Sequence, residues 1–239
     1  MIQAVIFDFG QTLVDSANGF ITAEKAAKEV LFSSLFPDKS EDTWQVFLST
    51  YRRMRKDFHA RSVFSRAKLW TAVFKHFSRT PDPDRIERWE TDYWAQVKAM
   101  TSTFTETFEV LESLCKTYKL AMITNTQGQK MPGSHRIALF PDLETFFDPI
   151  IVAGESGIPP KPHPEAFRLC LEKLDLKPRQ AVFVGDDWRI DICGARDAGL
   201  YPVWLKHRAI KRNWPKADAP VPVITDLIQL PDRIAKISD

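Results

Sequence analysis

Hydrophobic positions along the chain gather in short runs, and longer stretches with a helical period separate them. Five runs are rich in β-branched and aromatic residues and have turn or polar residues at their borders: Ala4–Phe9, Leu120–Thr124, Ile150–Ala153, Ala181–Val184 and Tyr201–Leu205. Continuous apolar runs of this length are typical of strands that are buried on both faces of a parallel sheet. The pattern therefore predicts a parallel β-sheet.

Amphipathic stretches of helix length lie between the later runs. They cover Glu109–Tyr118 and Glu165–Leu174, and a third helix is expected to begin at Asp191 and to end at Gly199. Glycine often ends a helix because it adopts the left-handed backbone conformation without strain. Strands that alternate with helices predict an α/β fold with right-handed crossovers.

The stretch from Ser16 to Met100 differs, because it contains helical periods and no convincing strand. Aromatic residues are frequent enough there to build a separate small core. We therefore expect an all-helical domain over residues 16–100, inserted into a core domain formed by residues 1–15 and 101–239. Its helices are expected at Ala23–Phe36, Thr43–Phe58, Ser65–Phe77 and Pro83–Val97.

Composition is that of an ordinary globular protein. The 239 residues are 44% hydrophobic and 27% charged, and 33 basic side chains against 31 acidic ones give a net charge of +2. This balance gives no argument for a nucleic-acid partner, and no run reaches the roughly 18 apolar residues of a membrane span. Three widely spaced cysteines favour reduced thiols and a cytoplasmic location. Oligomeric state has no readable signal.

Polar residues close several of the apolar runs, where open parallel sheets bind their ligands. A single polar residue at such a place usually has a structural explanation, for example as a turn or helix-cap residue. Several of them, each after its own apolar run, together indicate a site. Lys161 lies after the third run among four prolines, which restrict the backbone that carries it. The other candidates are Asp8 and Gly10 after the first run, Thr124 and Asn125 at the second, and Asp186, Asp187 and Asp191 after the fourth.

This ordered set of residues resembles the haloacid dehalogenase-like hydrolase superfamily, and the resemblance covers nearly the whole chain. It implies a Rossmann-like sheet as the core. The insert directly after the first motif is similar to the helical-cap (C1) group, in which a mobile cap closes over the site. The resemblance further implies a Mg²⁺-dependent phosphatase that acts on a small phosphorylated metabolite.

The resemblance also implies roles for the individual residues. Asp8 would be the nucleophile that forms an aspartyl-phosphate. Thr124 and Lys161, with Gly10 and Asn125 beside them, would hold the phosphoryl group. The metal ligands would be Asp8, the Gly10 carbonyl and Asp186, while Asp187 or Asp191 would orient the waters of the metal.

Physical chemistry supports these roles independently. A carboxylate can attack phosphorus and divide one difficult displacement into two easier steps. Several carboxylates in one pocket repel one another unless a divalent cation and an ammonium group neutralise them. Mg²⁺ prefers oxygen ligands and needs only one or two protein carboxylates. A lysine and a threonine hydroxyl can stabilise the charge that develops on a phosphoryl group.

Gly10 departs from the pattern of the resembled phosphatases. These enzymes usually carry a second Asp two residues after the nucleophile, where it serves as general acid and base. Glycine can offer its carbonyl to a metal, but it transfers no proton, and such help is worth about a hundredfold to ten-thousandfold in rate. Asp15 and His59 are candidate substitutes, but the sequence favours a cap or hinge role for Asp15 and a solvated helix face for His59.

The departure leaves two alternatives to a phosphatase open. One is a hydrolase of carbon–halogen or carbon–phosphorus bonds, because halide needs no acid and phosphonatases use a cap lysine. Four insert lysines could serve there: Lys25, Lys28, Lys56 and Lys68. The other alternative is a non-catalytic relative that binds metal and a phosphorylated ligand without turnover. The chain retains all the remaining motif residues, and this argues against that alternative.

Overall fold

The computed structural model describes residues 1–37, 40–126, 136–211 and 213–238. Contacts divide the chain into two compact units. The sheet unit contains Met1–Asp15, Ser102–Asn125 and residues 136–238, and the helical unit contains Ser16–Thr101 together with Thr126.

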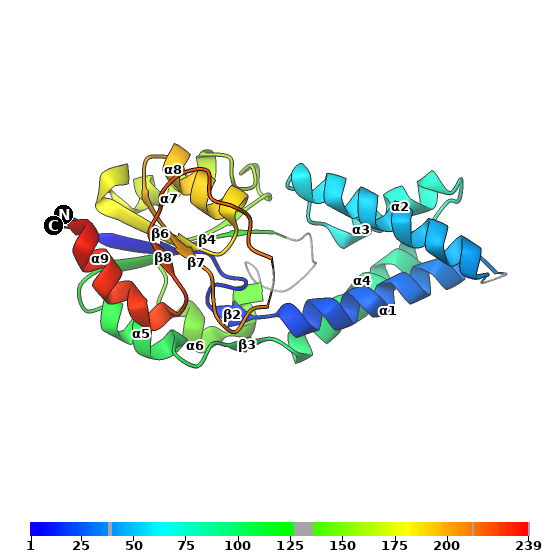
Figure 1. Cartoon of the computed structure of the whole chain (residues 1–239), viewed down its shortest axis with the longest axis horizontal. Helices are drawn as coiled ribbons and strands as arrows, with labels where there is room; N and C mark the ends of the chain where they lie inside the picture. Colours follow the sequence, from blue (N-terminus) through cyan, green and yellow to red (C-terminus); the bar gives the residue numbers. More distant parts are fainter. Residues whose placement is uncertain (38–39, 127–135, 212, 239) are drawn as a thin grey trace. The chain divides into compact units, whose positions relative to one another are not determined.

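A six-stranded parallel sheet forms the centre of the sheet unit (Figure 1). Its strand order is β5-β4-β1-β6-β7-β8, so the chain adds strands on one side of β1 and later continues on the other. Open α/β sheets bind ligands where the order reverses in this way. The predicted Rossmann-like α/β fold is confirmed. The strands are β1 (Ala4–Phe7), β4 (Lys119–Asn125), β5 (Ile150–Ala153), β6 (Ala181–Gly185), β7 (Tyr201–Leu205) and β8 (Val223–Ile224).

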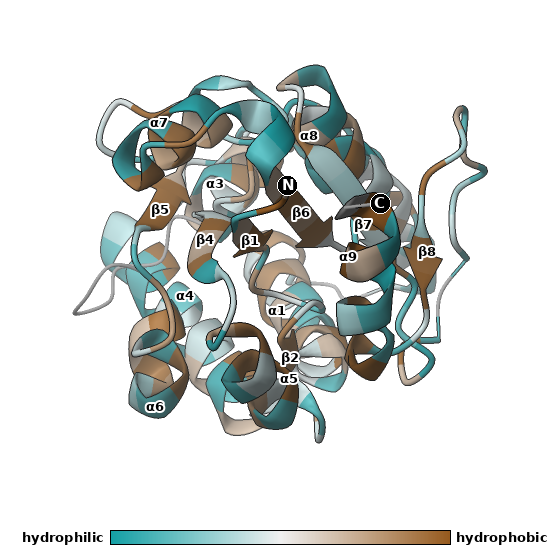
Figure 2. Ribbon diagram, turned by 90° about the vertical axis from the view of Figure 1, so that its left-hand side faces the viewer, coloured by the Kyte–Doolittle hydropathy of each residue, from teal (hydrophilic) through white to brown (hydrophobic). Residues whose placement is uncertain are grey.

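Helices cover both faces of this sheet. In Figure 2 the hydrophobic strands lie between α7 and α8 on one face and α5, α6 and α9 on the other. The elements are α5 (Thr107–Leu114), α6 (Pro141–Glu144), α7 (Glu165–Leu174), α8 (Gly194–Asp197) and α9 (Leu230–Ser238), with the helical turns η1 (Arg136–Leu139), η2 (Pro178–Gln180), η3 (Trp188–Cys193) and η4 (Leu227–Gln229).

Alternate residues of β1 belong to the two hydrophobic cores of the sheet unit. Ala4 and Ile6 pack in the core that includes α7 residues, while Val5 and Phe7 pack in the core that includes α5 and α9 residues. All four side chains have 0% exposure. A strand buried on both faces has no polar alternation, which is why the sequence shows it as an unbroken apolar run.

The structure differs from the sequence expectations at several element ends. β1 ends at Phe7, two residues before the expected end at Phe9, and the chain then turns into the loop that carries Gly10. Helical structure after β6 begins at Trp188 rather than Asp191, because the Asp187 carboxylate accepts a hydrogen bond from the backbone of Ile190 and caps the turn.

Some short elements were not expected from the sequence. An antiparallel ribbon of β2 (Val14–Asp15) and β3 (Ser102–Thr103) stands apart from the main sheet. Strand β8 and helix α9 complete the sheet unit near the end of the chain. Two-residue strands are too short to show a period of hydrophobicity, so only α9 had a readable signal.

In its described residues the helical unit has four helices: α1 (Ala17–Leu35), α2 (Glu41–Ala60), α3 (Arg66–His76) and α4 (Pro83–Ala99). Three of them begin at a side chain that accepts a backbone N–H of the first turn, namely Ser40, Ser65 and Asp82. Each such cap contributes about 1 kcal/mol. The helices enclose an aromatic core in which Trp70 is completely buried.

Helix α1 begins at Ala17, six residues before the expected start at Ala23. Glycine is unfavourable inside a helix, so the presence of Gly19 argues against a helix in this segment of the sequence. The structure supplies the reason for the glycine: a Cβ atom there would lie 2.9 Å from the carbonyl oxygen of Val97. Gly19 therefore permits the close approach of α1 and α4.

A buried polar network ties helices α1, α2, α3 and α4 of the helical unit together. Glu24 of α1 accepts hydrogen bonds from the hydroxyls of Tyr51 at 2.8 Å and Tyr93 at 3.3 Å. The Arg66 Nε atom lies 3.4 Å from the same carboxylate and donates to the Tyr93 hydroxyl at 3.0 Å. Burial, with the Glu24 carboxylate adding to it, raises the pKa of Tyr51, so its hydroxyl stays a donor.

Two further observations concern the chain as a whole. None of the helices in the described ranges combines the length with the apolar character that a membrane crossing requires. Cys115, Cys170 and Cys193 are free thiols.

We expect Glu24→Ala to destabilise the helical unit strongly. The substitution removes the carboxylate from the buried Arg66 guanidinium, and breaking a buried ion pair in this way costs about 3–5 kcal/mol. Urea unfolding followed by tryptophan fluorescence measures this loss. The matched control is Glu29→Ala on the exposed side of the same helix, which should change stability by less than about 0.5 kcal/mol. Equal stability of the two variants would contradict the assignment.

Candidate active site

Asp8 lies at the carboxyl end of the central strand β1. Its backbone N–H donates to the carbonyl of Val184 in β6 at 2.9 Å, which holds the residue beside the end of that strand. The Thr12 hydroxyl donates to the Asp8 Oδ2 atom at 3.4 Å. Only 9% of Asp8 is exposed, so its carboxylate is a largely buried charge.

The loop after β6 supplies three more aspartates. Asp186 and Asp191 are buried, whereas Asp187 is half-buried and caps the turn η3. The backbone N–H of Asp187 donates to the Asp191 Oδ2 atom at 3.0 Å, so the turn brings Asp191 back toward the strand end. This return turn has π-helical geometry, which is frequent at functional sites.

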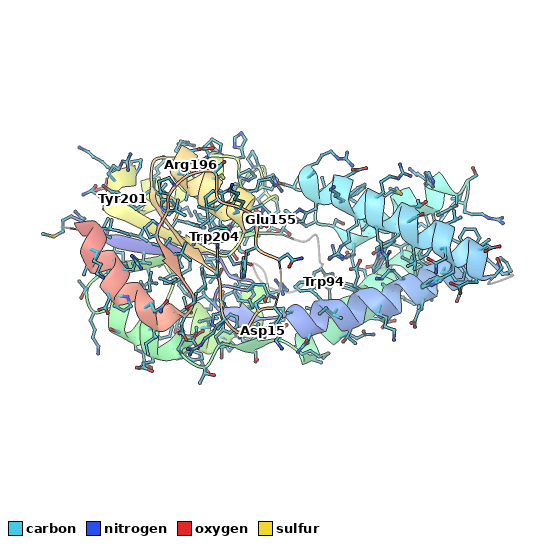
Figure 3. The ribbon with its side chains drawn as sticks, viewed as in Figure 1. Asp15, Trp94, Glu155, Arg196, Tyr201 and Trp204 are labelled. Carbon is cyan, nitrogen blue, oxygen red and sulfur yellow. The ribbon has the colours of Figure 1, made fainter. Side chains whose placement is uncertain are left out.

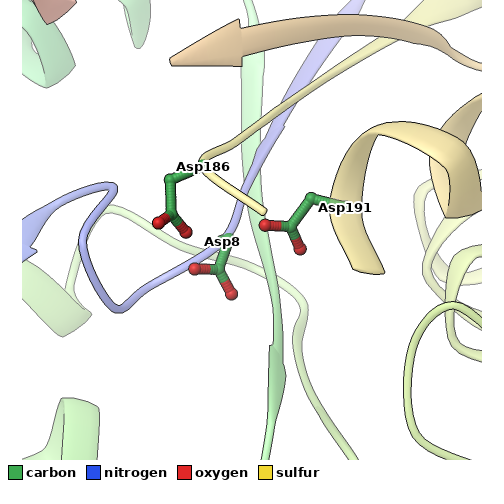
Figure 4. A group of neighbouring side chains, drawn as sticks. All are labelled: Asp8, Asp186 and Asp191. Carbon is green, nitrogen blue, oxygen red and sulfur yellow. The ribbon is translucent and has the colours of Figure 1, made fainter. Parts of the chain in front are cut away.

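Three carboxylates converge at this place. One oxygen from each of Asp8, Asp186 and Asp191 lies within 4.8 Å of the other two. Figure 4 shows the three side chains directed toward one another from the end of β1, the loop after β6 and the following helical turn. The Asp187 carboxylate is not part of this group, because it is used as the cap.

The carboxylate cluster fits a hard divalent cation. Burial raises the pKa of Asp191 to about 7; Lys161 opposes this shift, and the nearby Asp8 and Asp187 add to it. Like charges in a buried place are costly, and a divalent cation removes that cost. An all-oxygen donor set suits Mg²⁺ better than softer metals. Gly10, expected to offer its carbonyl, lies two residues after Asp8 in the same loop.

Lys161 is buried inside the cluster with 1% exposure. Its Nζ atom lies 2.8 Å from Asp8 Oδ1 and 2.7 Å from Asp191 Oδ1, and it also donates to the carbonyl of Ile123 at 2.8 Å. Burial alone would lower the pKa of this ammonium, but the carboxylates of Asp191 and Asp8 outweigh it and raise the pKa. Lys161 therefore stays charged.

The end of β4 positions the Lys161 loop. The Asn125 Oδ1 atom accepts the backbone N–H of Lys161 at 2.8 Å, and the Asn125 Nδ2 atom donates to the Lys161 carbonyl at 3.2 Å. This pair of bonds fixes the backbone of Lys161 to the sheet. The contact of Asn125 is thus with the loop, and its expected contact with a substrate stays a prediction.

Thr124 lies beside Asn125 in β4 and is 3% exposed. Within the described ranges its hydroxyl has no hydrogen-bond partner in the protein, so it can donate to a ligand. The candidate substitutes for the acid lie elsewhere in the chain. Asp15 lies in β2 outside the carboxylate cluster, and His59 lies in α2 with its ring against Phe64.

Two contacts of the site were not anticipated from the sequence. The hydroxyl of Thr12 contacts Asp8, and the indole of Trp204 donates to the carbonyl of Asp186 at 2.9 Å. Trp204 lies in β7 of the sheet unit (Figure 3) and packs against the ring of Trp188 of η3. The sequence marks Thr12 only by its closeness to Asp8, and nothing in it links Trp204 to the loop.

Known proteins resemble the chain over most of its length. Glyceraldehyde 3-phosphate phosphatase of Pyrococcus furiosus is 27% identical over 86% of this chain and 81% of its own. Pyrophosphatase PpaX of Bacillus mycoides is 26% identical over 98% of each chain. The crystal structure of 2-haloacid dehalogenase from Pseudomonas syringae pv. Tomato matches with a TM-score of 0.66 at 27% identity and covers 99% of both chains.

A family model described as haloacid dehalogenase-like hydrolase matches residues 2–199, which include Asp8, Thr124, Lys161 and the aspartate loop. This match confirms both the resemblance and the expected enzyme class, and the chain belongs to the haloacid dehalogenase-like hydrolase family.

Proposed function

We propose that the chain is a Mg²⁺-dependent phosphatase that hydrolyses a small phosphorylated metabolite through an aspartyl-phosphate on Asp8. The observation that carries the proposal is the Asp8 carboxylate, which lies at a strand end 2.8 Å from a buried ammonium and beside two further carboxylates. The relatives support the substrate class, because one is named for glyceraldehyde 3-phosphate and another is named a pyrophosphatase.

The residues of the site divide the work of the reaction. An Asp8 oxygen attacks phosphorus, and water later releases the phosphate from the acyl-phosphate. The Thr124 hydroxyl donates to the phosphoryl oxygens. All three donors of Lys161 already have acceptors, so Lys161 mainly balances the charge of Asp8 and Asp191 and can exchange one partner for a phosphoryl oxygen.

A cation at this place would be held by side chains that converge on it and by waters. Asp8, the Gly10 carbonyl and Asp186 are the proposed direct ligands, and Asp191 or Asp187 is proposed to orient waters. When bound, Mg²⁺ supplies positive charge that draws the phosphoryl group toward Asp8 and stabilises its transition state. The three converging carboxylates support this assignment.

Residues 16–100 are proposed to act as the mobile cap of a core formed by residues 1–15 and 101–239. A cap that closes over the site excludes bulk water and strengthens the electrostatic interactions inside. The separate core of the helical unit supports this role, because a domain with its own packing can move as one body. Cytoplasmic location stays a prediction, and three free thiols are consistent with it.

A second candidate is displacement of halide from carbon by Asp8. The structural match to a 2-haloacid dehalogenase and the glycine at position 10 favour it, because halide leaves without a proton. The carboxylate cluster weighs against it, since halide displacement needs no metal. Halide release that persists in the presence of a metal chelator would support this candidate over the phosphatase.

We expect Asp8→Asn to abolish the Mg²⁺-dependent release of phosphate from p-nitrophenyl phosphate. The amide is a poor nucleophile, so turnover should fall by at least about a thousandfold. The control is Asp232→Asn at an exposed position of α9, which should keep wild-type turnover. Retained activity in Asp8→Asn with an unchanged melting temperature would show that Asp8 is not the nucleophile.

Gly185→Ala should weaken Mg²⁺ binding. A Cβ atom on Gly185 would lie 2.5 Å from the Asp191 Cβ atom, so the Asp191 side chain has to move away from the cluster. Wild-type protein should melt at a higher temperature as Mg²⁺ is added, because a ligand of the folded state stabilises it. The variant should show a smaller increase at the same concentration. An equal increase would mean that Asp191 plays no part in holding the ion.

A further inference from the structure

The space beside Gly10 is occupied by an arginine. A Cβ atom built on Gly10 would lie 3.1 Å from the Nη2 atom of Arg136, the first residue of η1. That Cβ is the root of the side chain that carries the general acid in the resembled phosphatases. The guanidinium group therefore lies against the position from which the missing acid would extend.

Arg136 is held in place by its surroundings. It is 5% exposed, and its Cζ atom lies 5.3 Å from the centre of the Phe9 ring, which is itself completely buried. The next residue, Ile137, is part of the hydrophobic core of the sheet unit. The side chain of Arg136 thus packs on Phe9, and its backbone is held next to the core. Arg136 belongs to the same unit as Asp8 and Gly10.

A guanidinium group cannot take over the role of the acid. It does not release its proton in proteins, so it protonates no leaving group. It binds anionic oxygens well, because its planar donors match phosphate and carboxylate geometry. A site with glycine and arginine in place of an acidic side chain therefore favours a group that departs as an anion.

We propose that Arg136 binds the leaving group and that the preferred substrates are phosphoric anhydrides, from which a phosphate departs without being protonated. This inference rests on the proposed function, because it presupposes attack by Asp8 on phosphorus. It assigns Arg136 as a further catalytic residue and names the substrate class by the group that leaves.

The two chemical steps balance without a general acid. In the first, an Asp8 oxygen bonds to phosphorus, the bond from phosphorus to the bridging oxygen breaks, and the departing phosphate keeps the electron pair beside Arg136. In the second, a water oxygen bonds to phosphorus and the electron pair of the acyl-phosphate bond returns to Asp8. Both protons of the water remain on the released phosphate, which exchanges them with solvent.

The first test compares substrates on the wild-type protein with Mg²⁺. We expect kcat/KM for pyrophosphate to exceed that for β-glycerophosphate by at least about a hundredfold, because an alkoxide leaves poorly without an acid. Equal or faster hydrolysis of β-glycerophosphate would overturn the inference. If neither these substrates nor an aryl phosphate releases phosphate, the proposed function itself has failed.

The second test changes Arg136. Arg136→Met should lower kcat/KM for pyrophosphate by about tenfold to hundredfold, as expected for loss of a hydrogen bond to a charged group. Hydrolysis of 2,4-dinitrophenyl phosphate should fall less than about threefold, because its leaving group delocalises its own charge. Arg136→Lys should retain part of the wild-type preference for pyrophosphate over 2,4-dinitrophenyl phosphate. An unchanged ratio of the two substrates would overturn the inference while leaving the phosphatase assignment intact.

The control for this variant is Arg179→Met. Arg179 also stacks on an aromatic ring, that of Tyr201 at 5.1 Å, but it lies in η2 before β6 begins, at the opposite end of the strands from Asp8. The Arg179→Met variant should leave the ratio of kcat/KM for pyrophosphate to kcat/KM for 2,4-dinitrophenyl phosphate unchanged. A control that shifts the ratio as much as Arg136→Met would indicate a general effect of losing an arginine and would overturn the inference.

Gly10→Asp provides a test that keeps Arg136. The backbone of Gly10 is not left-handed, and the atom nearest to a new Cβ is the end of the Arg136 side chain at 3.1 Å, so a shift of that end by a few tenths of an ångström accommodates the variant. We expect it to raise hydrolysis of β-glycerophosphate at least about tenfold relative to pyrophosphate, because an acid then serves the alkoxide. No change in that ratio would overturn the inference even if Arg136→Met fails to fold.

Discussion

The buried ammonium of Lys161 is the charge on which the site depends. It lies between the carboxylates of Asp8 and Asp191, at 2.8 Å and 2.7 Å, in a place almost closed to solvent. Uncompensated carboxylates at such a place would be protonated or would separate, and a protonated Asp8 is no nucleophile. The ammonium contacts both acids and offsets their mutual repulsion, and this makes both a cation site and a carboxylate attack physically reasonable.

This charge arrangement exists only in the folded sheet. Lys161 and Asp8 are separated by 153 positions in the sequence. Asp8 follows β1, and the loop that carries Lys161 follows β5, so the loop reaches Asp8 across the end of β4, which lies between these two strands. Two small features then complete the geometry. Asn125 fixes the backbone of Lys161 from the end of β4, and Gly185 leaves room for Asp191 to return over the strand.

Much of the sheet was predictable because strands buried on both faces leave continuous apolar runs. β5, β7 and α7 have the bounds that the pattern predicts, and the motif residues could be placed at strand ends from the topology rules alone. The start of α1 was hidden by Gly19, whose close contact with Val97 is visible only in three dimensions. Helix α9 was not among the predicted elements, although Leu230 and Ile234 share one helical face.

The site was less predictable than the sheet. Order and spacing in the sequence identified Asp8, Lys161 and Asp191 as candidates. They did not show that Asp187 caps a turn or that Asn125 binds the loop of Lys161. The sequence does not mark Arg136 as a site residue, because no local pattern connects an arginine in η1 with a glycine near the start of the chain. Contacts of this kind depend on how segments far apart in sequence pack, which periodicity does not report.

The helical unit has its own aromatic core and its own buried Glu24 network, and neither contributes a residue to the charge cluster of the sheet unit. The two parts of the gene can therefore accumulate changes under different constraints. Surface positions on the four helices are free to drift toward new ligands, while the aspartates and the lysine stay bound by electrostatic balance. An enzyme built in this way can diversify in what it recognises without rebuilding the chemistry it performs.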